Sequence, residues 1–131
     1  MSVYIDSNIF LYVALRNPDF FKSCEQLLLK VQQQEILAIT SVVTLCEVHY
    51  EVQKQLGIEA ANLTVQSILS LPMTVVALDL HILSSALHQV KEHRLQTMDA
   101  VHYATALAFT TDTFYSYDKD FNRIEIPRKE P

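Results

Sequence analysis

The residues most able to do chemistry in this chain are four carboxylates that lie far apart along it: Asp6, Glu47, Asp99 and Asp118. Asp6 and Asp118 each end a β-prone segment, and Asp99 lies in the first turn of a predicted helix. In open parallel sheets, ligands collect at the carboxyl ends of the strands because the loops there converge on one edge. Glu47 interrupts an apolar run one helical turn beyond Val43, close to the face expected to pack inward. The sequence therefore predicts that the four acids meet at one edge of a sheet.

A cluster of this kind requires a cation. Two carboxylates about 4 Å apart repel each other by roughly 4 kcal/mol at an effective dielectric of about 20. Hard oxygen ligands without supporting Cys or His favour Mg²⁺ or Mn²⁺, which keep several waters and also bind phosphate oxygens. The chemistry that follows is in-line hydrolysis of a phosphodiester. One ion lowers the pKa of the attacking water, and a second ion, where present, stabilises the leaving oxygen.

Strands and helices alternate along the chain. Strands are predicted over residues 3–5, 36–39, 74–78 and 114–117, with a fifth candidate at 124–126. Helices are predicted over residues 9–15, 20–31, 42–56, 59–71, 80–90 and 98–109. This order implies right-handed crossovers and a three-layer α/β sandwich, with a mostly parallel sheet of four to five strands. We expect one domain over residues 1–131, with a tail at 127–131 that frays.

Composition narrows the classes of function. Nucleotide-binding loops of the Rossmann or P-loop type need several glycines, and this chain has one, Gly57. The net charge of −5 argues against a constitutive nucleic-acid coat but not against a nuclease, because an acidic metal site contributes negative charges itself. Cys24 and Cys46 lie in helix-like apolar patterns and are expected to be buried free thiols. No apolar run approaches the roughly 20 residues that span a bilayer, and the polar start is unlike a signal peptide, so a cytoplasmic protein is expected.

Four blocks of the sequence resemble those of PIN-domain ribonucleases, and most closely those of VapC-type toxins of toxin–antitoxin pairs. The blocks are Tyr4–Asn8, Ser41–Glu47, Met98–Leu107 and Ser116–Phe121. Together they span nearly the whole chain in the family's order. One departure concerns the loop before the third acid, which is often rich in glycine or proline in the family but here reads Glu92–Gln96.

The resemblance implies a PIN-like fold and a metal-dependent endoribonuclease that hydrolyses RNA and is held in check by an antitoxin protein, with a homodimer as the expected assembly. It implies that the four acids form the catalytic and metal-binding quartet, and that Asp120 beside them can hold a second ion. Ser116 matches the hydroxyl residue that braces the first acid, while Ser7 and Asn8 match polar residues that orient it.

Each acid also has an ordinary structural explanation, as a helix cap, a first-turn residue, a turn residue or a solvated helix position. Asp79 ends a strand as well, and its better interpretation is an N-cap. Near His93, Lys91 and Arg94 make a small basic patch that could contact RNA phosphates, although a solvated helix end explains them equally. The histidine spacings do not fit a zinc site, and His102 is expected to be a packed or surface residue rather than a ligand.

Two other functions are compatible with this pattern. A signalling receiver module is also an α/β sheet with aspartates at strand ends, but it needs an acidic pair after the first strand, where Asp6 is followed by Ser7 and Asn8. A degenerate PIN fold that acts only through protein binding is the second alternative, and the presence of all four acids disfavours it.

Overall fold

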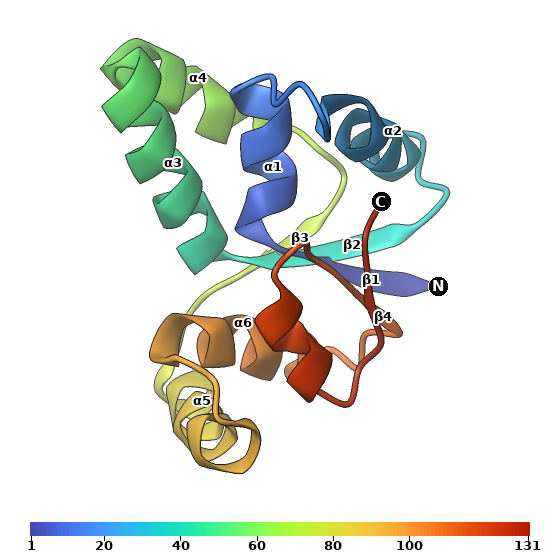
Figure 1. Ribbon diagram of the computed structural model, residues 1–131, viewed down its shortest axis with the longest axis vertical. Coiled ribbons are helices and arrows are strands. Elements are labelled where there is room, and N and C mark those ends of the chain that lie inside the picture. The colour runs from blue at the N-terminus through green and yellow to red at the C-terminus, as the bar shows by residue number, and fades with distance from the viewer.

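The computed structural model describes residues 1–131 and forms three layers, with a parallel sheet between two layers of helices (Figure 1). The five strands run in the order β3-β2-β1-β4-β5 and all pair in parallel. Their bounds are β1 Ser2–Ile5, β2 Leu37–Ser41, β3 Thr74–Val76, β4 Thr113–Tyr115 and β5 Arg128–Lys129. The helices are α1 Ser7–Ala14, α2 Phe21–Gln32, α3 Val42–Leu56, α4 Ile58–Leu69, α5 Leu80–His93, α6 Thr97–Ala108 and the short 3₁₀ helix η1 Lys119–Arg123. The predicted three-layer α/β sandwich is therefore confirmed.

The central strand β1 supplies side chains to both hydrophobic cores. Val3 and Ile5 belong to the core that α1, α2, α3 and α4 cover. Tyr4, which lies between them, points to the opposite face and packs in the core formed with α5 and α6. Figure 1 shows the same division, with α1 to α4 on one side of the sheet and α5 and α6 on the other. Burial on both faces explains why the three residues of this strand from Val3 to Ile5 are all hydrophobic.

Local capping sets the points at which several helices begin and end. The Asp6 carboxylate accepts a hydrogen bond from the Ser7 amide at the start of α1, and the Ser41 hydroxyl accepts one from Val43 at the start of α3. Asp79 caps α5 through the amide of Ile82, as predicted. Gly57 ends α3 with φ at 95°, a conformation that residues with a side chain rarely adopt. Because Asp6 and Ser41 directly follow β1 and end β2, these caps also place the two helix starts at the carboxyl edge of the sheet.

The end of the chain differs from the prediction. Residues 124–126 do not form a strand. They follow η1, which starts where Asp118 accepts a hydrogen bond from the Asp120 amide and whose Phe121 is fully buried. The chain rejoins the sheet later, at β5. The tail expected to fray is consequently held there, with the amide of Phe114 donating to the Pro127 carbonyl.

The two cysteines differ in their exposure to solvent. Cys24 is buried as predicted, and burial raises the pKa of its thiol to about 11. The prediction for Cys46 was wrong, because its position on α3 is exposed.

None of the helices combines the length and the apolar character required to cross a membrane.

Candidate functional site

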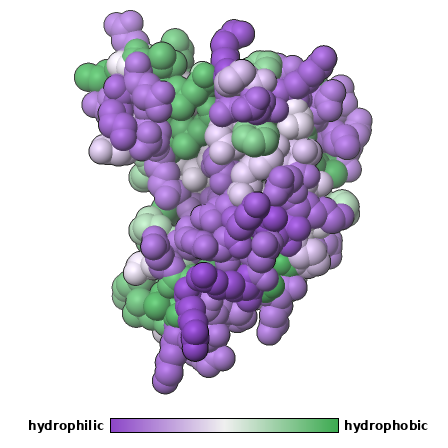
Figure 2. Space-filling model, viewed as in Figure 1, coloured by the Kyte–Doolittle hydropathy of each residue, from purple (hydrophilic) through white to green (hydrophobic).

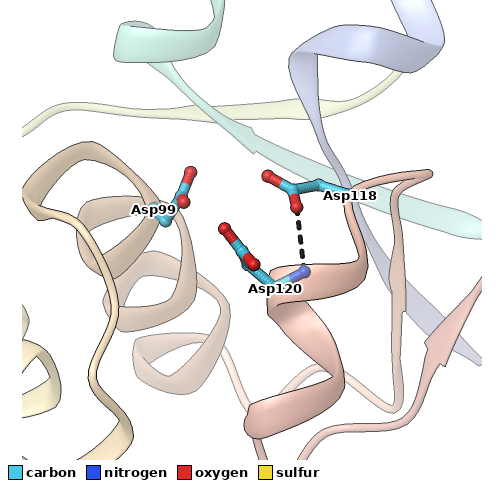
Figure 3. Close-up of side chains that lie close together, drawn as sticks. All are labelled: Asp99, Asp118 and Asp120. Carbon is cyan, nitrogen blue, oxygen red and sulfur yellow. Dashed lines mark hydrogen bonds between the residues drawn. The ribbon is translucent and has the colours of Figure 1, made fainter.

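Three carboxylates converge at the carboxyl edge of the sheet: Asp99, Asp118 and Asp120. One oxygen of each lies within 4.8 Å of one oxygen of the other two, and all three residues are partly buried. Figure 3 shows Asp99 reaching from α6 toward the two aspartates that flank the start of η1. This set of hard oxygen donors, with no thiol or imidazole among them, fits Mg²⁺ or Mn²⁺.

The local backbone orients two of these acids. Asp118 follows the carboxyl end of β4, and its Oδ1 accepts a hydrogen bond of 2.9 Å from the Asp120 amide. Asp120 is also approached by the Arg123 guanidinium, one turn later in η1, at 3.8 Å. Asp99 lies in the first turn of α6, where the helix dipole favours a negative charge. Helix termini from two parts of the chain therefore hold the cluster together.

The acidic side chains of the site carry more negative charge than the neighbouring cationic groups neutralise. Burial and then the charges of Asp118 and Asp6 raise the pKa of Asp99 to about 6. The charge of Asp6 acts on Asp99 because Asp6 lies near the same edge, although none of its oxygens belongs to the three-carboxylate cluster. A divalent cation placed between these groups would relieve the repulsion that the raised pKa reflects.

Asp6 is held rigidly beside the cluster. It is only 5% exposed, and its Oδ2 accepts a hydrogen bond of 2.6 Å from the Ser116 hydroxyl, while its Oδ1 accepts from the Ser7 amide at 2.8 Å. The side-chain amide of Asn8 donates to both Asp6 and Ser116. Ser116 also accepts a hydrogen bond of 3.0 Å from the Asp118 amide, so one buried hydroxyl connects the first and fourth of the predicted acids.

Glu47 approaches the site through a histidine. Its Oε1 lies 2.7 Å from Nε2 of His102, and the same nitrogen lies 3.7 Å from Oδ1 of Asp6. The Glu47 side chain is 35% exposed, so it lies at the border of the site, neither in bulk solvent nor within the three-carboxylate cluster. The structure thus brings Asp99, Asp118 and Asp120 into one cluster and places Asp6 and Glu47 around it.

The sequence left His102 open as a packed or a surface residue. The structure shows that it is packed, and the sequence interpretation missed the contacts that this histidine makes with two acids. His102 is 1% exposed on α6, with Nδ1 2.7 Å from the Tyr4 hydroxyl. Burial alone would lower its pKa. The neighbouring Tyr4, the hydrogen bond to Glu47 and the negative charges of Asp6 and Glu47 outweigh that effect and raise the pKa well above the usual histidine value. The signal in the sequence was its position three residues after Asp99 in a predicted helix. The structure adds that residues 100–106 of this helix are all buried.

The two basic residues predicted to contact RNA are both exposed near the end of α5. Arg94 ends the helix in a left-handed conformation, and its carbonyl accepts a hydrogen bond of 2.9 Å from the Arg123 guanidinium. Because Arg123 also approaches Asp120, Arg94 is connected to the acidic cluster through its backbone. No corresponding connection joins Lys91 to the cluster.

Comparison with known proteins agrees with this geometry. The family model described as "PIN domain" matches residues 3–127. Among solved structures, VapC20 of Mycobacterium tuberculosis, a toxin described as cleaving the sarcin-ricin loop, superimposes with a TM-score of 0.83 at 16% identity, covering 98% of this chain and 99% of that one. A chain of VapBC2 from Rickettsia felis, bound to a fragment of its promoter DNA, gives 0.78 at 19% identity over 99% and 98% of the two chains.

A chain of DNA-bound VapBC from Salmonella typhimurium gives a TM-score of 0.75 at 18% identity, covering 99% of this chain and 98% of that one. No curated protein matches the chain significantly. At these identities the solved structures establish a shared fold, and the family model covers almost the entire sequence. This chain is therefore a member of the PIN domain family, with the fold of the VapC toxins.

Proposed function

We propose that this protein is a divalent-metal-dependent endoribonuclease and the toxin of a toxin–antitoxin pair. The observation that carries the proposal is the cluster of Asp99, Asp118 and Asp120, with the buried carboxylate of Asp6 beside it. Membership of the PIN family supports nuclease chemistry, and the likeness to VapC and VapBC structures supports a toxin.

In the proposed centre, Asp99, Asp118 and Asp120 would hold Mg²⁺ or Mn²⁺, and Asp6 and Glu47 beside them would serve as further ligands. When bound, such an ion supplies a water of lowered pKa and offsets the charge of the phosphate. The protein contributes orientation, because Ser116 and Ser7 hold the two oxygens of Asp6 by hydrogen bonds of 2.6 and 2.8 Å. The exposed side chains of Lys91 and Arg94 are proposed to contact RNA phosphates at the margin of the site.

An antitoxin is the proposed partner, because the similar structures include toxin–antitoxin complexes. A groove of about 380 Å³ between α1, α2 and α4 is the surface that suits an apolar segment of such a partner. Its apolar lining includes Phe10, Val13, Leu28, Leu29, Ile68 and Leu71. Figure 2 shows hydrophobic residues at the upper left of this view, around α3 and α4, and a second group at the lower left, over α5. A homodimer, which rests on the family resemblance alone, and a cytoplasmic location complete the proposal.

Cleavage of RNA by the purified protein tests the proposal. Wild-type protein with Mn²⁺ should cleave RNA, and activity should disappear with a chelator and in Asp99→Asn. Glu35→Gln is a matched control, because Glu35 is exposed in the turn before β2, at the amino end of the parallel strands and away from the site. Equal cleavage by wild-type protein and Asp99→Asn would overturn the assignment. Calorimetry that detects no Mn²⁺ binding at all would favour the alternative of a non-catalytic protein-binding module.

A further inference from the structure

We infer that His102 is a positioning residue for the proposed reaction, holding the Glu47 carboxylate against the site through Nε2 while Tyr4 fixes the imidazole ring. The inference rests on the proposed function, since it concerns the geometry of the acids that would serve the metal. It explains how Glu47, one-third exposed on α3, is kept toward the other acids rather than turning into solvent.

The contacts of the ring define this role. Nε2 lies between two carboxylates, 2.7 Å from Glu47 Oε1 and 3.7 Å from Asp6 Oδ1. On the other side of the ring, Nδ1 lies 2.7 Å from the Tyr4 hydroxyl and 3.4 Å from that of Thr44. Both ring nitrogens are therefore engaged, and the ring is almost completely buried. A side chain with these contacts has little freedom to rotate.

The chemistry of the neighbours decides which nitrogen carries the proton. Ionised carboxylates only accept hydrogen bonds, whereas hydroxyl groups either donate or accept. Nε2 faces the carboxylates of Glu47 and Asp6, so it carries a proton whether the ring is neutral or charged. Nδ1 faces hydroxyl groups of Tyr4 and Thr44, which adapt to either state. The donor toward Glu47 is thus a constant feature of the ring.

A buried polar network extends behind the histidine. Thr40 Oγ1 lies 2.8 Å from Thr44 Oγ1 and 2.7 Å from the carbonyl oxygen of Ile5. With Tyr4 and His102, these groups come from β1, β2, α3 and α6. Apolar residues of similar volume often stabilise a core as well as a buried polar set does, so packing alone does not explain the network. Among the predicted acids, this network contacts only Glu47 and Asp6, and it does so through Nε2 of His102.

Two substitutions of His102 separate positioning from packing. In His102→Gln the side-chain amide can donate from near the place of Nε2, whereas His102→Leu fills the space without a donor. We expect His102→Leu to lose about 10- to 100-fold in Mn²⁺ affinity and RNA cleavage, the range seen when the partner of a metal ligand is removed, and His102→Gln to recover most of that loss. Thr105→Val is the matched control, because Thr105 is buried on the same helix and its hydroxyl bonds only the Val101 carbonyl.

Two measurements keep the inference testable if His102→Leu does not fold. In wild-type protein, the ¹⁵N spectrum of the imidazole should show a proton on Nε2, and a neutral ring protonated only on Nδ1 would overturn the inference. Tyr4→Phe removes one hydroxyl and keeps the stacking ring, and it should weaken Mn²⁺ binding measurably more than Thr105→Val does. Equal Mn²⁺ affinities in these two variants would count against the role of Tyr4 in fixing the ring.

The possible failures can be told apart. If wild-type protein binds Mn²⁺ but cleaves no RNA, the proposed function fails, while the Mn²⁺ affinities and the imidazole spectrum still test His102. If wild-type protein cleaves RNA and folded His102→Leu binds Mn²⁺ and cleaves as well as wild type, the inference about His102 fails and the function stands. A loss in His102→Leu that His102→Gln does not recover at all would also contradict a role based on the N–H donor.

Discussion

Replacing Asp99 by asparagine is expected to stabilise the metal-free protein while removing its stabilisation by metal. Burial and the neighbouring charges of Asp118 and Asp6 raise the pKa of Asp99 from the ordinary 3.8 to about 6. The folded protein therefore binds this proton more tightly than the unfolded chain does. This contribution to stability is complete below the unfolded pKa and is lost as pH rises through about 6, so at neutral pH the ionised carboxylate no longer stabilises the fold.

The expected size follows from the two pKa values. The difference between 3.8 and about 6 corresponds to roughly 3 kcal/mol, at about 1.36 kcal/mol for each tenfold change in proton affinity. Asp99 is only partly buried, so water screens some of the repulsion, and a gain of about 1 to 2 kcal/mol in the free energy of unfolding is the reasonable expectation. For a domain of this length, that gain raises the melting temperature by about 4 to 8 °C.

Thermal unfolding followed by circular dichroism measures the effect. With a chelator at about pH 8, Asp99→Asn should melt above wild type, and near pH 4 the difference should shrink because Asp99 is then largely protonated in the folded protein. Glu35→Gln should melt with wild type at both pH values. Mn²⁺ at about 100 times its Kd should stabilise wild type by roughly 2.7 kcal/mol and the variant by much less. A variant that melts at or below wild type in chelator at about pH 8 would refute the reasoning that Asp99 is held in a repulsive field.

Three further predictions concern the same edge of the sheet. Mn²⁺ affinity should fall by up to about tenfold for each pH unit below about 6, because Asp99 must lose its proton to bind the ion. A calorimetric titration that gives a constant Mn²⁺ affinity from about pH 8 to about pH 5 would contradict this prediction. Ser116→Ala should destabilise the protein by about 1 to 3 kcal/mol in urea unfolding, because the buried hydroxyl makes three hydrogen bonds, whereas Ser67→Ala, an exposed site, should change it by less than about 0.5 kcal/mol. Arg128→Ala should lower the melting temperature more than Lys129→Ala, because the Arg128 guanidinium donates to the Ser116 carbonyl and to Asn122; equal melting temperatures would show that β5 needs no side-chain anchor.

Much of the fold is determined by features that are local in the sequence. Asp6, Ser41 and Asp79 cap helices because each follows an extended segment and carries a side-chain oxygen that can accept an adjacent amide. Apolar segments separated by such caps predict alternating strands and helices, and the rule for parallel crossovers then predicts the layers. The same reasoning places Asp6 and Asp118 at strand ends, so the edge that carries the acids could be predicted without coordinates.

Only the tertiary structure decided which of these acids lie close together and which residues connect them. Asp120 joins Asp99 and Asp118 because the cap at Asp118 starts a 3₁₀ turn, and a sequence pattern does not report the direction of that turn. His102 meets Glu47, 55 residues away, because α3 and α6 approach each other at the edge of the sheet from opposite faces. Helical periodicity assigns a residue to a buried face, but the partner on that face depends on how the helices pack. A histidine that bonds one acid and lies near a second therefore has the same local pattern as one in an ordinary core.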